Sequence, residues 1–554
     1  MAISGNRALV EQLLADGFEH VFGNPGTVEQ GLLDALGDYP QLRYILGLHE
    51  SVCVAMADGY ARATGGPALV QLHSGVGLGN GIGLLYQALR GHSPLVVLAG
   101  EAGLRYEAFD AQMAVDLVAM AAPVTKYATR VTDPGSLLRV VRRAVRIAMT
   151  PPRGPVFVAL PADVLDEDNT EAVAPTVFPR TKSVPAGHLL DEAADLLAPA
   201  RRPVILVGDG VAASGAQQQV AALADLWGAE VWGVDSGELN VPGRHPLYRG
   251  QLGHMFGHVT EGRLAGADGV LVVGTYLFPE VFPALEPPFP PGTPIVHLDQ
   301  DAEQIAKNHP VSLGLVADPA AGLEALIGPL GRAMGMAGMS RAAARLDAAR
   351  QLAVRKATWQ LPDTLADRFF AEVARACPPG LTLFDEALTA SDVVARHLPP
   401  CTPGHWFQTR GGSLGVGVPG ALGIKLAHPR RPVLAVTGDG GVMYTIQALA
   451  TAARYGIGAK VVVCNNSRYR LLDHNLEQYR SERGQGPRPA PEGFDLSSPR
   501  IDFPGLAAAQ GVAAVAVRTP EDVPEAVRRM FADDEPFLVD LLTEPLPEGR
   551  EERR

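Results

Sequence analysis

One short segment constrains the fold of this 554-residue chain more than any other. The apolar run 433–437 leads into Gly-Asp-Gly-Gly at 438–441, and the apolar run 460–464 leads into two asparagines. A strand, a glycine-rich turn, a helix and a second strand form one βαβ unit of a parallel sheet. Because ligands bind outside the carboxyl ends of such strands, we expect Asp439 and Asn466 to lie together at one sheet edge.

The residues expected at that edge suit a hard divalent cation. Asp439 supplies an anionic oxygen, Asn466 a neutral one, and the backbone carbonyl of Arg468 a third. Ligands of this kind bind Mg²⁺ or Ca²⁺ and leave positions free for phosphate oxygens and water. The backbone can approach a diphosphate closely at the three glycines of the motif, Gly438, Gly440 and Gly441. Each motif alone is compatible with an ordinary turn, but the pair at this spacing predicts a metal–diphosphate site.

Apolar runs of strand length alternate with helix-length segments along most of the chain. This alternation predicts three tandem α/β domains with parallel sheets flanked by helices, at residues 1–165, 186–331 and 362–545. An acidic segment, 165–185, links the first two domains; segment 332–361 is expected to be a helical or flexible connector, and the charged tail, 548–554, to fray. The predicted strands are 20–22, 43–46, 68–72, 95–99 and 156–160, then 204–207, 231–233, 270–273 and 295–298, then 382–384, 433–437, 460–464, 513–517 and 537–541.

Charge and composition narrow the classes of function. Lys and Arg total 47 against 60 Asp and Glu, and a net charge of −13 disfavours nucleic acid or a membrane surface as partner. The four cysteines match neither a zinc spacing nor a disulfide framework, so we expect a reducing cytoplasm. Residues 1–17 lack the apolar core of a signal peptide, and apolar runs fall short of the roughly 20 residues of a membrane span. We therefore expect a soluble cytoplasmic protein.

The motifs resemble a known family. Gly438-Asp439-Gly440 together with Asn465-Asn466 resembles the signature of thiamine diphosphate-dependent enzymes. The resemblance implies that Asp439, Asn466 and the Arg468 carbonyl hold the metal that anchors the diphosphate, with Tyr469 also at the cofactor. It further implies a pyrimidine-binding domain, a middle domain and a diphosphate-binding domain, in that order along the chain.

Glu50 is the predicted activating acid. It follows an apolar run and starts a predicted helix over 50–64, in a segment that resembles the one carrying the activating glutamate in this family. Such a carboxyl group shares a proton with the pyrimidine, so that the cofactor's amine can remove the thiazolium C2 proton. The alternative is a charge that offsets a helix dipole. In the family this glutamate meets the metal motif across a subunit boundary, so the resemblance implies a homodimer, usually doubled to a tetramer.

Further segments resemble benzoylformate decarboxylase: Phe-Gly-Asn-Pro-Gly-Thr at 22–27, Leu-His-Ser at 72–74, Arg-His-Pro-x-x-Arg-Gly at 244–250, and Gly-Gly-Ser-Leu-Gly at 411–415. By that resemblance the Gly412 carbonyl accepts from the aminopyrimidine, and Leu414 is the apolar wedge that bends the cofactor. An ordinary core leucine is the alternative for Leu414. Thr27 matches a serine that contacts the substrate, and His73 matches a histidine that assists proton transfer. The alternative for His73 is a strand-end histidine satisfied by backbone groups.

Two departures from that pattern bear on the substrate. The position that matches the family's second histidine is Val281, in the segment 274–282, with no histidine nearby in the sequence. The segment 112–123 instead resembles benzaldehyde lyase and, more loosely, acetohydroxyacid synthase, in which a glutamine matching Gln112 faces the reacting centre. The alternative for Gln112 is a solvent-facing helix residue. Leu471 and Leu472 are expected to wall the pocket and favour an aryl or branched alkyl group, unless they belong to the core.

The resemblance implies thiamine diphosphate- and Mg²⁺-dependent decarboxylation of an aromatic or bulky 2-oxo acid to an aldehyde through an enamine, with Ca²⁺ as a substitute metal. The alternative activity is that of a carboligase or aldehyde lyase, which makes or cleaves 2-hydroxyketones. A relative without activity, kept as a binding protein, is disfavoured by intact Glu50, Asp439 and Asn466. FAD is not indicated, because Val-Gly-Asp-Gly at 207–210 has no full dinucleotide fingerprint after it.

Overall fold

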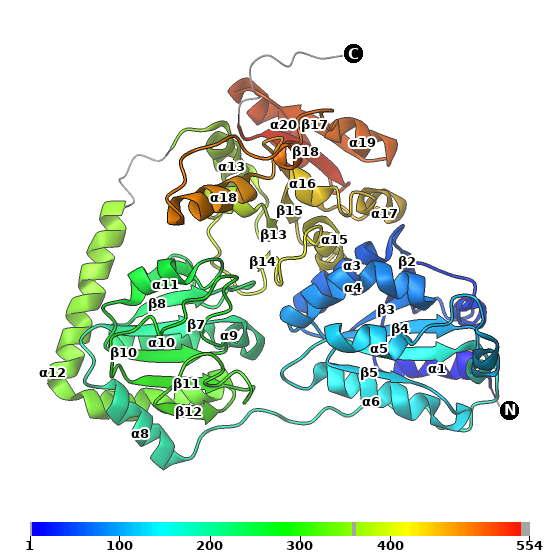
Figure 1. Ribbon diagram of the computed structural model, residues 1–554, viewed down its shortest axis with the longest axis horizontal. Helices are drawn as coiled ribbons and strands as arrows, with labels where there is room; N and C mark the ends of the chain where they lie inside the picture. The colour runs from blue at the N-terminus through cyan, green and yellow to red at the C-terminus, as the bar shows by residue number, and fades with distance from the viewer. Residues whose placement is uncertain (1–2, 357–361, 545–554) are drawn as a thin grey trace. The chain divides into compact units, whose positions relative to one another are not determined.

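The computed structural model describes residues 3–356 and 362–544. It forms two compact units: the first holds the described residues of Met1–Phe178, Pro362–Leu398 and Gln408–Arg554, and the second those of Pro179–Leu361 and Pro399–Phe407. The predicted fold class is confirmed, since the chain builds three parallel six-stranded sheets with helices around them (Figure 1). The predicted charged tail, 548–554, and the end of the predicted connector, 357–361, lie outside the described residues.

The first sheet has the strand order β2-β1-β3-β4-β6-β5. Its inner strands are buried along almost their whole length, as parallel strands covered on both faces must be. Helices α1 and α6 pack on one face, while α4 lies against Leu72 of β3 on the other. The elements are α1 (Gly5–Ala15), β1 (His20–Gly23), α2 (Gln30–Leu36), β2 (Arg43–Leu46), α3 (Glu50–Thr64), β3 (Ala68–His73), α4 (Ser74–Arg90), β4 (Leu95–Glu101), α5 (Leu117–Ala121), β5 (Tyr127–Arg130), α6 (Leu137–Met149), β6 (Val156–Pro161) and α7 (Ala162–Leu165).

The second sheet, in the middle of the chain, has the order β12-β11-β10-β7-β8-β9, with an apolar core on each face. The predicted connector begins inside a long helix, α12, which kinks where Gly335 adopts a φ of 58°. The elements are α8 (Gly187–Leu197), β7 (Pro203–Val207), α9 (Asp209–Ser214), α10 (Gln217–Trp227), β8 (Glu230–Val234), β9 (Tyr248–Leu252), α11 (Gly257–Leu264), β10 (Gly269–Val273), β11 (Ile295–Asp299), β12 (Leu313–Val316) and α12 (Pro319–Lys356).

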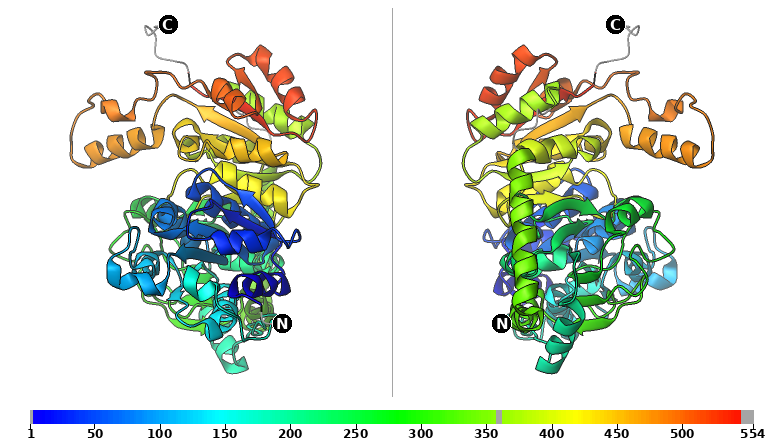
Figure 2. Two further views of the ribbon diagram at one scale, coloured as in Figure 1. Left: turned by 90° about the vertical axis from the view of Figure 1, so that its right-hand side faces the viewer. Right: turned by 90° about the vertical axis from the view of Figure 1, so that its left-hand side faces the viewer.

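The third sheet has the order β14-β13-β15-β16-β18-β17. Both views of Figure 2 show α18 and the segment after it projecting away from this sheet. The elements are α13 (Leu365–Ala376), β13 (Thr382–Glu386), α14 (Ser391–His397), β14 (Trp406–Gln408), α15 (Gly417–Ala427), β15 (Val433–Gly438), α16 (Asp439–Val442), α17 (Ala448–Tyr455), β16 (Lys460–Asn465), α18 (Arg470–Glu482), α19 (Phe503–Ala509), β17 (Ala513–Val517), α20 (Val523–Met530) and β18 (Phe537–Leu542).

All fourteen predicted strands are present, and the structure adds β5, β9, β12 and β14 to them. Each added strand lies at an edge of its sheet. An edge strand is covered less completely than an inner one, so its sequence carries a weaker apolar signal. Among the described helices, none combines the length and apolar character that crossing a membrane requires.

Helices α3 and α15 join the first and third domains inside the first unit. Their backbones touch at two glycines: a Cβ on Gly59 would lie 2.0 Å from the Gly420 carbonyl oxygen, and one on Gly423 would lie 1.9 Å from that of Met56. No larger residue fits at either place. Because α3 begins at Glu50 and α15 follows the 411–416 loop, this contact fixes the starts of both helices.

Candidate functional site

The structure brings Asp439 and Asn466 together at the carboxyl edge of the third sheet. Strands β15 and β16 are neighbours, with Gly438 opposite Cys464. Asp439 Oδ2 accepts from the backbone N–H of Asn466 (3.1 Å) and of Arg468 (3.3 Å), and Oδ1 accepts from the N–H of Gly440 (2.8 Å). Burial raises the pKa of Asp439, and these backbone amides oppose the rise. The carboxylate, the amide and the Arg468 backbone therefore meet around one point.

This donor set suits a hard cation beside a diphosphate. Arg468 N–H also donates to Asn466 Oδ1 (3.0 Å), which orders the turn, and the Arg468 guanidinium pairs with Asp473. A Cβ on Gly440 would lie 2.3 Å from the ring of Tyr469, so this ring covers the glycine motif. No cluster of three or more His, Cys, Asp or Glu side chains able to hold a metal occurs within 3–356 or 362–544. The predicted set has one carboxylate, one amide and one carbonyl, and is not such a cluster.

Glu50 is buried at the first residue of α3, where the strand-to-helix turn after β2 places it. Both carboxylate oxygens are held: Asn80 Nδ2 on α4 donates to Oε2 (3.0 Å), and Asn24 Nδ2 after β1 donates to Oε1 (3.5 Å). A side chain that only offset a helix dipole needs no such fixed orientation. Sequence reasoning missed the role of both asparagines, although Asn24 lies in the motif at 22–27.

His73 ends β3 and is paired with a carboxylate that the sequence did not single out. Its Nδ1 lies 3.1 Å from Oε2 of Glu29, whose Oε1 accepts from the Gly100 N–H (3.1 Å). Burial raises the pKa of Glu29, and the interaction with His73 opposes this rise. The loop that carries Thr27 crosses this imidazole, because a Cβ on Gly26 would lie 1.9 Å from His73 Nδ1. Thr27 and His73 are thus brought together. The sequence signal that could have pointed to Glu29 is its position two residues after Thr27.

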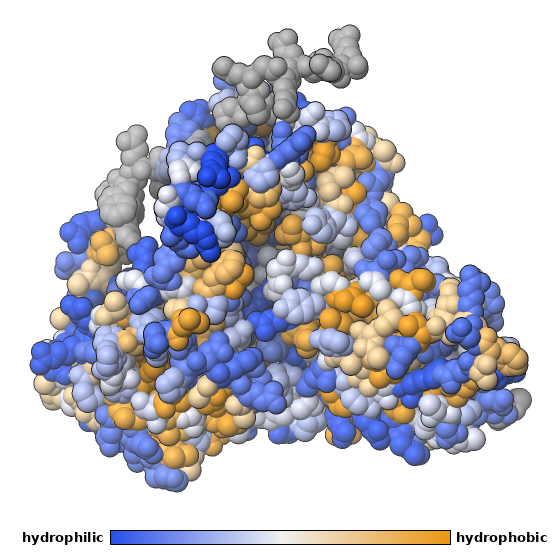
Figure 3. Space-filling view, viewed as in Figure 1, coloured by the Kyte–Doolittle hydropathy of each residue, from blue (hydrophilic) through white to orange (hydrophobic). Residues whose placement is uncertain are grey.

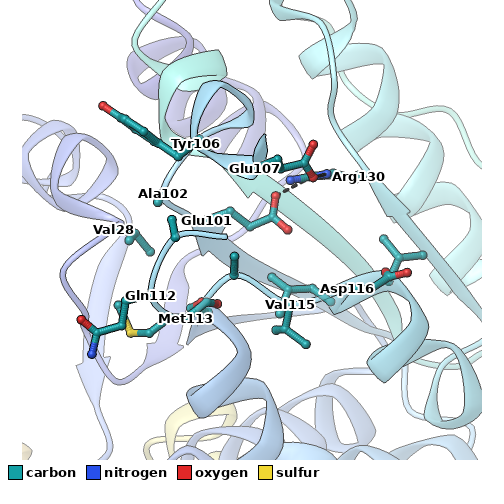
Figure 4. A pocket seen from close by; sticks show the side chains of 16 residues that line it. Val28, Glu101, Ala102, Tyr106, Glu107, Gln112, Met113, Val115, Asp116 and Arg130 are labelled. Atoms are coloured by element: carbon teal, nitrogen blue, oxygen red, sulfur yellow. Dashed lines mark hydrogen bonds and ion pairs between the residues drawn. The ribbon is translucent and has the colours of Figure 1, made fainter. Parts of the chain in front are cut away.

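Gln112 lies in an exposed turn that helps to line a cavity of about 390 Å³ in the first domain (Figure 4). Ser74 also lines the cavity and donates from Oγ to the Met113 carbonyl (3.3 Å), which ties this turn to the residue after His73. The far end of the cavity is charged: Arg130 pairs with Glu101 (2.6 Å) and with Glu107. The wall of the cavity is therefore mixed, with apolar surface near Gln112 and carboxylates opposite.

The 411–416 loop precedes α15 and contains glycines in the left-handed region, with φ of 65° at Gly411, 75° at Gly412 and 88° at Gly415. Leu414 is half-buried and does not belong to the buried core. The C-terminal end of the loop donates backbone hydrogen bonds to Glu386. This residue is a buried carboxylate on β13 that the sequence did not single out. The predicted strand 382–384 extends to Glu386, so an acid at the end of a buried strand was the signal missed.

The remaining predicted pocket residues, Val281, Leu471 and Leu472, lie on other elements than Thr27, His73 and Gln112. Val281 is in the second unit and is 60% exposed, with its N–H 3.3 Å from the His254 carbonyl oxygen. His254 in turn has Nδ1 3.0 Å from Asp235 Oδ1, so a histidine adjoins Val281 in space although none is near it in sequence. At the start of α18, Leu471 is half-buried and Leu472 is exposed, so neither belongs to the core.

Family models match three regions of the chain. Residues 3–120 match the thiamine pyrophosphate enzyme N-terminal TPP binding domain, 190–326 the central domain, and 389–541 the C-terminal TPP binding domain. The central match contains all six strands of the second sheet, while the first contains β1 to β4 of the first sheet and the third covers β14 to β18 of the third sheet.

Individual relatives are similar over almost the whole length. A benzoylformate decarboxylase of Pseudomonas aeruginosa is 32% identical over 97% of this chain and 98% of its own. A putative acetolactate synthase large subunit of Mycobacterium tuberculosis is 30% identical over 98% of this chain and all of its own. The solved structure of a thiamine diphosphate-dependent 4-hydroxybenzoylformate decarboxylase of Rhodococcus jostii RHA1 superposes with a TM-score of 0.82, at 29% identity, over 98% of this chain and 99% of that chain.

Proposed function

This chain belongs to the thiamine pyrophosphate enzyme family, and we propose that it is a Mg²⁺-dependent lyase that releases carbon dioxide from an aromatic or otherwise bulky 2-oxo acid. Thiamine pyrophosphate and thiamine diphosphate are two names for the same cofactor. The observation that carries the proposal is a pair of built half-sites: Glu50 held by two asparagines, and Asp439 joined to the Asn466 turn. Similarity to benzoylformate decarboxylase along almost the whole chain supports the reaction class.

The residues present fit the cofactor and its metal. Asp439, Asn466 and the carbonyl of Arg468 would hold Mg²⁺, which binds oxygen ligands of this mix and keeps positions for diphosphate oxygens. Gly438 presents backbone with open space beside it, which suits the close approach of a diphosphate, and the ring of Tyr469 packs against Gly440. The Gly412 carbonyl and Leu414 would receive the thiamine rings from the neighbouring loop.

When bound, thiamine diphosphate supplies a nucleophilic carbon and an electron sink for the electron pair that departing carbon dioxide leaves behind. Glu50 holds and releases a proton at its carboxylate, which its two asparagine donors keep in one orientation. A buried acid in a fixed place is the group that this proton exchange requires.

His73 and Thr27 act on the substrate side. The contact of His73 Nδ1 with the Glu29 carboxylate favours the tautomer with the proton on Nδ1, so Nε2 is the atom that can take up a proton from solvent and pass it to the product carbon. The exposed Thr27 hydroxyl, on the loop that crosses the imidazole, binds and orients the substrate carboxylate. Leu471 and Leu472, outside the core, provide apolar surface for the aryl or branched alkyl group.

We further propose that two copies form the functional unit, paired again as a tetramer in the cytoplasm. Large apolar side chains are exposed beside each half-site: Leu48 and Val76 (both 56% exposed) near Glu50, and Tyr444 (56%) near Asp439. Figure 3 shows hydrophobic side chains gathered over α4 and α5. Exposed apolar surface of this kind marks an interface. The four cysteines are all free, which suits a reducing compartment.

A direct assay tests the proposed reaction. Purified protein, saturated with thiamine diphosphate and Mg²⁺, is incubated with benzoylformate and separately with benzoin. We expect carbon dioxide and benzaldehyde from benzoylformate. Benzaldehyde from benzoin, without carbon dioxide from benzoylformate or a panel of aliphatic 2-oxo acids, would overturn the decarboxylase assignment.

A second candidate function is that of a carboligase or aldehyde lyase on 2-hydroxyketones. One structural observation favours it: the turn that carries Gln112 lines a cavity of about 390 Å³ that Ser74 also lines, which offers space for a second carbonyl compound. The 30% identity to a putative acetolactate synthase large subunit supports the same alternative.

A further inference from the structure

A buried carboxylate links the two parts of the proposed cofactor site in the third domain. Glu386 ends β13 and is 2% exposed. It lies in register with Thr437 of β15, the residue just before the Gly438-Asp439 turn. On its other side it meets the end of the loop that carries Gly412 and Leu414. No step of the proposed reaction accounts for an acid at this place.

The carboxylate of Glu386 accepts four hydrogen bonds. Oε1 accepts from the backbone N–H of Gly415 (2.5 Å) and of Val416 (3.1 Å). Oε2 accepts from the N–H of Gly417 (2.9 Å) and from the hydroxyl of Thr437 (3.1 Å). Burial raises the pKa of Glu386 to about 6, although the four hydrogen bonds oppose the rise. The group is therefore ionised at pH 8. Bonds to an ionised acceptor are about twice as strong as neutral ones.

The loop that Glu386 binds has little internal structure to hold it. Three of its residues, Gly411, Gly412 and Gly415, adopt positive φ, and glycine-rich backbone costs more entropy to order than other backbone. Its far end is fixed by Glu386 and by Thr445, whose Oγ1 donates to the Gly415 carbonyl (2.6 Å). The fit is close, since a Cβ on Gly417 would lie 2.7 Å from Glu386 Oε2.

We propose that Glu386 is a positioning residue that holds the 411–416 loop in place against the diphosphate-binding end of β15. The inference rests on the proposed function, because the loop matters here as the part that receives the thiamine rings. The metal–diphosphate turn has hydrogen bonds of its own, from Asp439 to Gly440, Asn466 and Arg468. Loss of the Glu386 charge therefore weakens binding of the rings and leaves binding of the diphosphate nearly intact.

Two ligands separate these effects. Calorimetry at pH 8 measures binding of thiamine diphosphate, and separately of inorganic pyrophosphate, to the full-length apoprotein with Mg²⁺. Glu386→Gln replaces an acceptor oxygen with an amide NH₂, which cannot accept from the backbone N–H groups of the loop. We therefore expect the affinity for thiamine diphosphate to fall at least tenfold. The affinity for pyrophosphate should stay within threefold of wild type. The matched control is Asp385→Asn, an adjacent buried acid that accepts from Ala387 and Ser391 and does not bind the loop. It should leave both affinities within threefold.

The outcomes are distinct. Wild-type affinity for thiamine diphosphate in Glu386→Gln, or an equal loss of pyrophosphate binding, overturns this inference alone. Wild-type protein that takes up no thiamine diphosphate overturns the proposed function and this inference together. If Glu386→Gln does not fold, Thr437→Val removes one donor to the same carboxylate without changing side-chain shape. We expect this variant to weaken binding of thiamine diphosphate by threefold or more while binding of pyrophosphate is unchanged. If thiamine diphosphate is not selectively affected, the inference is overturned.

Discussion

His73 Nδ1 and Glu29 Oε2 lie 3.1 Å apart, and the Glu29 carboxylate is almost completely buried beside the end of β3. The Gly100 N–H holds the other carboxylate oxygen, so the acid cannot rotate away from the imidazole. A carboxylate fixed in this way sets the tautomer and the orientation of the histidine. The pair therefore leaves Nε2 of His73 as the ring nitrogen that can exchange a proton with the substrate.

The first prediction tests this pair. Glu29→Gln keeps the side-chain shape but removes the charge that orients His73 Nδ1–H, so we expect kcat to fall about tenfold. His73→Ala should lower kcat further. The double variant should be no slower than His73→Ala alone, because Glu29 acts only through the imidazole. Additive losses of kcat in the double variant would contradict the assignment.

The second prediction concerns Glu50. Glu50→Gln keeps the side-chain shape and an oxygen for Asn80 to bond, but it cannot exchange the proton. We expect kcat to fall by about 100-fold or more, while calorimetric uptake of thiamine diphosphate stays within tenfold of wild type. The exposed Glu19→Gln on the same domain is the control and should change neither quantity. Unchanged turnover in Glu50→Gln would show that another group supplies the acid.

The third prediction concerns the metal. Dialysis against a chelator should abolish uptake of thiamine diphosphate, and adding back Mg²⁺ or Ca²⁺ should restore it. Asp439→Asn removes the one anionic oxygen of the predicted ligand set, so we expect the Mg²⁺ concentration for half-maximal uptake to rise at least tenfold. Uptake that persists in the presence of chelator would exclude the role assigned to Asp439, Asn466 and Arg468.

Much of this arrangement could be predicted from the sequence because it follows from strand ends. Asp439 and Asn466 each follow a buried apolar strand, and the parallel order of β15 and β16 brings their ends together. Glu50 was predictable for the same reason, as the residue that starts the helix after β2. Signals of this kind are local, since a short stretch of sequence contains both the strand and the group that it delivers.

The partners of Glu29, Asn80 and Glu386 could not be predicted in this way, because they are distant in sequence. Glu29 meets His73 44 residues later, and Glu386 meets Thr437 51 residues later through the pairing of β13 with β15. Such pairings depend on the order of strands in a sheet, which hydrophobic periodicity does not specify. The four missed strands share this cause, since each is an edge strand recognised by its neighbour more than by its own residues.

The fourth prediction concerns stability in the middle of the chain. Burial raises the pKa of Asp299, at the end of β11, to about 7, and the charge of Asp301 adds to the rise. The unfolded value is about 4, so the folded state keeps the proton between roughly pH 4 and 7 and the unfolded state does not. The contribution of Asp299 to stability is therefore full below pH 4 and is lost as the pH rises through 7, a change on the order of 2–4 kcal/mol.

Asp299→Asn removes this dependence while it keeps an oxygen to accept from the Asp301 N–H (2.8 Å). We expect the thermal unfolding midpoint of the variant, relative to wild type, to rise by several degrees between pH 5 and pH 8. The control is the exposed Glu192→Gln on α8, which should show no such trend. A constant difference between Asp299→Asn and wild type across that range would mean that Asp299 is ionised throughout.

The fifth prediction separates the two proposed activities through Gln112. Release of carbon dioxide followed by protonation needs one substrate, whereas carboligation needs a second carbonyl compound held beside the first. Gln112 lines a cavity of about 390 Å³, and its amide is a group that can donate a hydrogen bond to that second carbonyl oxygen. We expect Gln112→Ala to slow benzoin formation and cleavage at least tenfold and to change carbon dioxide release less than threefold.

Met113→Leu, a volume-conserving change in the same turn, is the control for packing. Equal losses of both activities in Gln112→Ala would assign this residue to binding of the 2-oxo acid, and would remove the structural support for a carboligase.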